Sequence, residues 1–179
     1  MLPTAHRSRA NATPQIVLGI DPSLRGTGYG VIYVGKTESR ALAHGTITCP
    51  PKWERSRCLL KILQTIRDVV KEFQPTVCAV EGLIYANNFQ IALKIGEARG
   101  AALAAVAEAG LDIYEIAPRK VKQAIVGYGA AQKLAVAKMV QRRLNLEQLP
   151  EPDAADALAL AIVHAQEQGK FSLTALKKV

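Results

Sequence analysis

Four acidic residues stand where apolar segments of the chain begin or end, and they are the side chains best placed to do chemistry. Asp21 and Glu81 each follow a short apolar run, and Asp153 and Asp156 open the apolar helical pattern of residues 153–163. A carboxylate beside a buried element is costly unless a cation meets it. Hard oxygen ligands of this kind suit Mg²⁺ or Mn²⁺, so the four residues are candidate metal ligands.

The spacing of the two last aspartates suits a shared site. Asp153 and Asp156 are three residues apart, so they lie on one face of a helix. Acids in a first turn also simply suit the positive end of a helix, and taken alone this plainer interpretation is the stronger one. If the strands that end at Asp21 and Glu81 are neighbours, however, four carboxylates meet and their repulsion calls for divalent cations. Two such cations about 3.5–4 Å apart serve phosphodiester hydrolysis, because one activates water and the other stabilises the leaving 3′ oxygen.

The amino-acid composition limits the classes of molecule that the chain is expected to bind. The chain has 179 residues, 49% of them hydrophobic, and a formal net charge of +8. These values indicate one globular domain that binds a polyanion such as nucleic acid, although a merely soluble basic protein has the same balance. No apolar run reaches the ~18 residues that cross a bilayer, so no membrane partner is expected. The three cysteines lack metal-ligand spacing and are expected to be free thiols in a reducing compartment.

Basic residues gather in the last third of the chain. Lys122 and Lys133 flank the loop 127–129, which contains two glycines, and are candidates for phosphate contact. Arg119 and Lys120 are further candidates for DNA contact. For three other cations a solvated helix face is the preferred interpretation: Lys138, Arg142 and Arg143.

The segment after Glu81 contains groups that suit nucleic-acid bases. Tyr85, Asn88 and Phe89 lie there, and an aromatic side chain beside the carboxylates can stack on bases or wedge between them. An aromatic side chain that closes the edge of the core is an equal alternative. His164 is eight residues, about 12 Å of helix, beyond Asp156, so it is expected to pack rather than bind metal.

Three glycines resemble a nucleotide-binding signal only weakly. Gly26, Gly28 and Gly30 do not follow the GxGxxG spacing, and a strand rather than a helix is predicted after them.

The hydrophobic pattern predicts an α/β fold. Three short-linked strands give an antiparallel meander, and two later apolar strands alternate with helices, as in a parallel arrangement. The result is a mixed five-stranded sheet flanked by helices, in a domain of residues 16–168 between flexible tails 1–15 and 169–179. The Arg-bearing start also vaguely suits a transit peptide. The predicted strands are 16–21, 29–34, 41–48, 76–81 and 111–117, and the predicted helices are 54–73, 88–109, basic segments from 119, and a last helix after Pro152.

Small residues recur every four positions in the helix predicted over 88–109. Ala92, Gly96, Gly100 and Ala104 form a stripe that allows close helix approach. Packing on the domain's own sheet and a subunit interface explain it equally well. Arg99 lies inside the same helix and receives no assigned role.

The motifs around these acids resemble those of the RuvC family of bacterial Holliday-junction resolvases over residues 16–166. The similar stretches are Gly19-Ile20-Asp21-Pro22, Thr27-Gly28-Tyr29-Gly30-Val31, Val80-Glu81, Ala92-Leu93-Lys94, Ala98-Arg99-Gly100, Val121-Lys122-Gln123, Val126-Gly127 and Asp153-Ala154-Ala155-Asp156-Ala157.

The resemblance implies an RNase H-like fold and a homodimer that resolves four-way DNA junctions in recombination and repair. It implies Mg²⁺-dependent symmetric nicks with 5′-phosphate and 3′-hydroxyl ends. It also implies RuvA and RuvB as partners, in the bacterial cytoplasm near the nucleoid. Four of its catalytic residues align with Asp21, Glu81, Asp153 and Asp156, and its catalytic-site lysines align with Lys122 and Lys133.

Two positions depart from the family pattern. Ser23 stands where the family usually has glycine, and Ile84 stands where a phenylalanine stacks on junction bases. Because isoleucine cannot stack, either Tyr85 or Phe89 substitutes for the phenylalanine, or the junction is distorted less.

Other activities remain open on the sequence alone. An RNase H-like nuclease for RNA and a non-catalytic junction-binding protein share these features. An actin-like ATPase also begins with a strand-end aspartate and glycines, but 179 residues leave no room for its second half.

Overall fold

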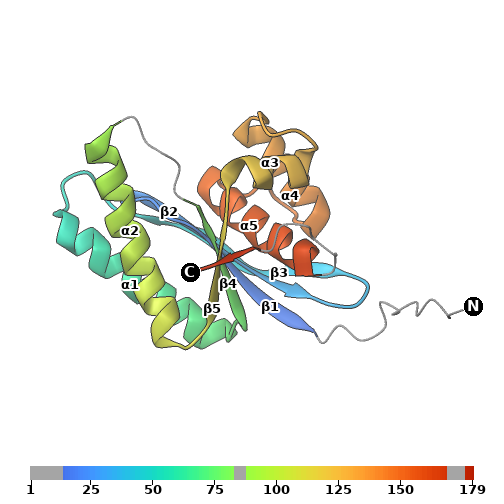
Figure 1. The fold of residues 1–179 in the computed structure, drawn as a ribbon, viewed down its shortest axis with the longest axis horizontal. Helices are drawn as coiled ribbons and strands as arrows, with labels where there is room; N and C mark the ends of the chain where they lie inside the picture. The colour runs from blue at the N-terminus through green and yellow to red at the C-terminus, as the bar shows by residue number, and fades with distance from the viewer. Residues whose placement is uncertain (1–13, 83–87, 169–175) are drawn as a thin grey trace, which may run out of the picture.

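A six-stranded sheet carries the fold in the computed structural model, which describes residues 14–82, 88–168 and 176–179 (Figure 1). Its elements in chain order are β1 (Gln15–Asp21), β2 (Gly26–Val34), β3 (Ser39–Thr48), α1 (Arg55–Phe73), β4 (Val77–Glu81), α2 (Phe89–Glu108), β5 (Asp112–Ile116), α3 (Pro118–Val126), α4 (Lys133–Leu144), α5 (Pro152–Gln168) and β6 (Lys177–Lys178).

The strands follow the spatial order β3-β2-β1-β4-β5-β6. β1, β2 and β3 are antiparallel neighbours, whereas β4 pairs parallel to β1 and to β5. The predicted combination of an antiparallel meander with two parallel strands is therefore confirmed.

The predicted number of strands is one too few. Lys177 and Lys178 form β6, antiparallel to β5, within the stretch 169–179 for which the sequence predicts a tail. Two consecutive lysines show no apolar alternation, so the pattern could not indicate a strand. Ion pairs hold them instead, since Lys178 Nζ lies 2.7 Å from Asp112 Oδ1 and Lys177 Nζ lies 3.5 Å from Glu115 Oε1.

Helices cover both faces of the sheet (Figure 1). On one face α1 and α2 pack on alternate residues of the central strands, such as Leu18, Ile20 and Val80. On the other face α3, α4 and α5 pack on the intervening residues, such as Val17 and Ala79. Successive residues of a strand face opposite sides of the sheet. The residue that follows Ile20 or Val80 in its strand therefore faces α3, α4 and α5.

Local signals set the helix ends. α1 ends at Gln74, which has a left-handed φ of 47° and precedes a proline. α3 begins with Pro118 and ends at Gly127, whose φ is 102°. The three cysteines are free and buried, as predicted. Among the residues that the structure describes, no helix is long and apolar enough to span a bilayer.

Candidate active site

Strand register brings the first two carboxylates together. The parallel β1–β4 pairing aligns Ile20 with Val80, and each strand then ends with an acid, Asp21 or Glu81. Ile20 and Val80 belong to the core on the α1–α2 face. The next residue along each strand therefore faces α5, and the side chains of Asp21 and Glu81 hydrogen-bond to each other.

Glycines let α5 deliver the other two carboxylates to the same place. A Cβ on Gly28 would lie 1.9 Å from the carbonyl oxygen of Asp153, and a Cβ on Gly19 would lie 1.9 Å from that of Ala157. Only residues without a side chain allow the backbone of α5 to lie this close to β1 and β2. Sequence reasoning missed this role, although the alternating spacing of Gly26, Gly28 and Gly30 was its signal.

Lys133 completes the cluster from the first residue of α4. Its Nζ lies 3.0 Å from Asp156 Oδ2 and 3.5 Å from Asp153 Oδ1. Burial lowers the pKa of Lys133, but its hydrogen bond and attraction to Asp156 outweigh that effect and raise the pKa overall. Lys133 is therefore a permanent ammonium group between the two aspartates of α5.

The carboxylates are held in unequal protonation states. Burial, followed by the charges of Glu81 and Asp156, raises the pKa of Asp21 to about 8. Burial also raises the pKa of Glu81, while the hydrogen bond from Asp21 and the charges of Lys133 and Lys122 limit the rise. At neutral pH Asp21 therefore carries a proton that it donates to Glu81. Burial raises the pKa of Asp156 as well, against the hydrogen bond and charge of Lys133.

The donor set fits a hard divalent cation. All four candidate ligands offer carboxylate oxygens, and the buried acids are balanced here by the proton on Asp21 and the ammonium of Lys133. Within the described ranges, no three acidic, histidine or cysteine side chains are already arranged as ligands around one point. A cation would therefore replace that proton and that ammonium contact, and Asp21, Glu81, Asp153 and Asp156 would turn toward it.

Arg99 of α2 hydrogen-bonds to the backbone at Glu81, a role that the sequence did not indicate. The residue is 6% exposed, and its guanidinium forms an ion pair with Glu115 of β5 and donates from Nη1 to the carbonyl oxygen of Glu81 at 3.4 Å. α2 is thereby tied to the strand end that carries a catalytic candidate. The only signal was a cation within an otherwise apolar stretch of helix.

The remaining predicted DNA contacts are distributed differently. Lys122 acts electrostatically on Glu81 and Asp156, so it belongs beside the cluster. Lys120 instead pairs with Glu167 at 2.9 Å, in the last turns of α5. Arg119 is exposed and packs against Gly129.

Residues at the start of α2 take a structural or an exposed position. Asn88 caps the helix, because its Oδ1 accepts hydrogen bonds from the backbone of Gln90 and Ile91. The side chain of Phe89 is 75% exposed, and its contact with DNA stays a prediction. Tyr85 and Ile84 lie outside the described residues.

Two other predictions have clear outcomes. Arg143 is not on a solvated face, because its Nη2 donates to the carbonyl oxygens of Ala124 and Ile125 and so caps α3. His164 is fully buried and contacts the ring of Tyr114, as its predicted packing role requires.

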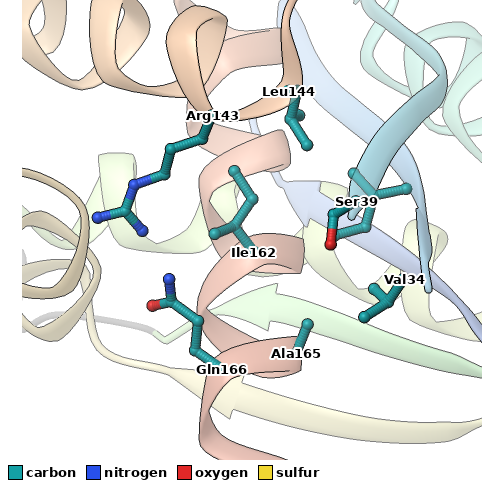
Figure 2. Close-up of a pocket in the computed structure, with 8 residues that line it drawn as sticks. Val34, Ser39, Arg143, Leu144, Ile162, Ala165 and Gln166 are labelled. Atoms are coloured by element: carbon teal, nitrogen blue, oxygen red, sulfur yellow. The ribbon is translucent and has the colours of Figure 1, made fainter. Parts of the chain in front are cut away.

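A separate pocket of about 320 Å³ lies away from the carboxylates (Figure 2). Its walls include Val34, at the end of β2 opposite Gly26, together with Leu144 and Ile162. None of the predicted site residues lines it, so it is not the active site.

Known proteins resemble this chain in sequence. The family model described as crossover junction endodeoxyribonuclease RuvC matches residues 17–164. A RuvC of Akkermansia muciniphila is 45% identical over 148 residues, which are 83% of this chain and 89% of that protein. A RuvC of Rubrobacter xylanophilus is 39% identical, with 93% of each chain covered.

A solved structure shares the fold. Thermus thermophilus RuvC, in complex with its Holliday junction substrate, superposes with a TM-score of 0.83 at 35% identity. The match covers 92% of this chain and 99% of that one. The chain therefore belongs to the RuvC family of crossover junction endodeoxyribonucleases, which have an RNase H-like fold.

Proposed function

We propose that the chain resolves four-way DNA junctions by divalent-metal-dependent hydrolysis, with symmetric nicks that leave 5′-phosphate and 3′-hydroxyl ends. The observation that carries the proposal is the convergence of four carboxylates from β1, β4 and α5 beside Lys133. The Holliday junction bound by the Thermus thermophilus relative supports the choice of substrate.

The acidic and the basic side chains have different roles in the proposed reaction. Asp21, Glu81, Asp153 and Asp156 would hold two divalent cations, Mg²⁺ or Mn²⁺, which supply an activated water and stabilise the leaving 3′ oxygen. Asp21 would release its proton to solvent on becoming a ligand. Lys133 is then free to turn from Asp153 and Asp156 to the scissile phosphate, and Lys122 neutralises the adjacent phosphate.

Mapping nicks on a synthetic mobile four-way junction tests the function directly. With Mg²⁺ we expect paired nicks at symmetric positions that a ligase can seal, and no cleavage in EDTA. Efficient cleavage of an RNA duplex but not of the junction would favour the RNA nuclease alternative. Tight junction binding without nicks, with either Mg²⁺ or Mn²⁺ present, would favour a non-catalytic junction-binding protein.

The surface of α2 supports a homodimer. A Cβ added at Gly96 or Gly100 would meet no heavy atom within 4 Å, so their stripe does not pack on the domain's own sheet. Phe89 and Leu93, on the same side of the helix, are 75% and 43% exposed. A symmetric dimer would present one active site to each of two opposed strands of a junction.

Replacing Gly100 with Glu is expected to shift the dimer toward monomer, because a buried unpaired charge and added bulk would enter the interface. Multi-angle light scattering at micromolar concentration measures this, with Gln64→Glu on the exposed face of α1 as the charge-matched control. A fully dimeric Gly100→Glu protein would place the interface elsewhere.

RuvA and RuvB as partners, and a position near the nucleoid, stay predictions from the family resemblance.

A further inference from the structure

A second groove, lined by both cationic and apolar side chains, lies between the start of α1 and the start of α2. It has a volume of about 600 Å³ and is lined by Arg25, Lys52, Trp53, Arg55 and Lys94, with Glu54 and five apolar or small neighbours. We call it the α1–α2 groove. It contains none of the four active-site carboxylates and neither Lys122 nor Lys133.

The walls of the groove carry excess positive charge. Four of the lining side chains are cationic and only Glu54 is acidic, so their formal net charge is +3. Arg55 pairs with Glu97 at 3.0 Å. Across the described residues, no ion pair neutralises Arg25, Lys52 or Lys94. Arg25 is held by neutral groups instead, because its Nη1 donates to the carbonyl oxygens of Pro50 and Trp53 at 2.6 and 3.1 Å.

The ring of Trp53 is in contact with two cationic side chains and so does not offer a free surface for stacking. The guanidinium of Arg57 lies 4.0 Å from the centre of its ring, and Lys61 Nζ lies 5.3 Å from it. These cation–π contacts hold both charges beside the groove. Since the ring already contacts two cations, the groove suits phosphates better than bases.

The groove opens at the same end of the strands as the active site, where β1 ends and β2 begins. Arg25 follows Asp21 by four residues, which limits their Cα separation to about 14 Å. β3 ends beside Gly26, which places the segment that contains Lys52 and Trp53 at this edge too. A DNA strand advances about 3.4 Å per nucleotide, so a strand cleaved at Asp21 needs only a few nucleotides to reach Arg25.

The groove and the stripe on α2 occupy different sides of that helix. At about 100° per residue, Ile91, Lys94 and Ile95 lie roughly 100–200° around the helix from Gly96 and Gly100. A partner that covers the stripe would therefore leave the groove open.

We propose that the α1–α2 groove binds the phosphate backbone of a DNA arm that leaves the active site. It contributes salt-dependent affinity without reading sequence. The inference rests on the proposed function for the direction of the strand, but not for the binding itself.

Fluorescence anisotropy of the full-length protein on a labelled four-way junction in EDTA tests the groove. We expect Lys52→Gln/Lys94→Gln to weaken binding roughly tenfold near 100 mM salt. We also expect it to lower the slope of log Kd against log salt by about 0.7–0.9 per lost phosphate contact. The control Lys36→Gln/Lys71→Gln removes the same charge from exposed positions, one in the connection after β2 and one in the last turn of α1, and should change neither quantity.

Equal losses in both double variants would overturn the proposal, because net charge alone would then explain the binding. A groove variant that binds DNA normally but loses its dimer by light scattering would also overturn it, in favour of a second copy of this chain. Junction cleavage by the wild-type protein in Mg²⁺ tests the proposed function separately.

Discussion

Asp21→Asn is expected to lower junction cleavage by about a thousandfold or more while leaving junction binding intact. The amide keeps the shape of the side chain but cannot serve as an anionic ligand of a divalent cation, so the attacking water and leaving oxygen would lose their stabilisation. Binding in EDTA persists because Asp21 is already protonated at neutral pH, so the neutral amide leaves the charge of the metal-free site unchanged. Single-turnover cleavage with Mg²⁺ and anisotropy in EDTA measure the two effects. Asp68→Asn, on the exposed face of α1, is the matched control, and near-normal cleavage by Asp21→Asn would contradict the assigned site.

The same variant has a second signature, in stability. The pKa of Asp21 rises from 3.8 to about 8 on folding, chiefly through burial and then through repulsion by Glu81 and Asp156. Between these values the folded chain holds a proton that the unfolded chain releases, so this group makes the metal-free protein less stable as pH rises from about 4 to 8. Asp21→Asn removes that dependence. Thermal melts in EDTA at pH 5 and 8 should therefore show a smaller loss of Tm for the variant than for the wild type.

Gly28→Val is expected to damage both the fold and the reaction. The new Cβ would overlap the Asp153 carbonyl oxygen at 1.9 Å, so the first turn of α5 must move away from β2. Overpacking of this kind costs about 1–3 kcal/mol, or roughly 2–10 °C in Tm for a chain of this size. Displacement of the two aspartates by about 1 Å would lower cleavage about a hundredfold.

Gln64→Ala is the control for this prediction, because Gln64 is exposed on α1, away from the site and from the stripe on α2, and alanine favours helices. Melting temperature and cleavage should be measured together, below the melting temperature of the weaker variant. A Gly28→Val protein with the Tm and cleavage rate of the wild type would show that close packing of α5 does not position the acids.

The sequence predicts the sheet because apolar runs and breaker residues mark its strands. β1 and β4 are short, nearly continuous apolar runs, and α1 has a regular apolar face that ends before Pro75. β6 has no such mark, since its stability comes from charges on β5 that lie far away in the chain. The pattern predicts the start of β2 three residues late because Gly26 and Gly28 indicate a loop, whereas in the fold they pair with β3.

The acids are predictable for the same reason, because each one adjoins an apolar run. What the sequence could not provide is how they are balanced. The contacts of Lys133 depend on where α4 begins relative to α5, and the Arg99–Glu115 pair joins a helix to a strand across the core. Lys120 meets an acid and Arg143 meets carbonyl groups because neighbouring cations in a sequence point to different sides of a helix, and only packing decides these contacts. The solvated face predicted for Arg143 is therefore wrong, whereas DNA contact by Lys120 stays a prediction.

The parallel pairing of β1 with β4 makes chain length itself a determinant of activity. Because side chains alternate between faces, deleting one residue inside either strand would turn its terminal carboxylate toward α1 and α2. A two-residue insertion would restore the face but move the acid by about 6.6 Å along the strand. Functional homologues should therefore vary in length in connections such as the hairpin between β2 and β3, and hold β1 and β4 at a constant number of residues up to their acids.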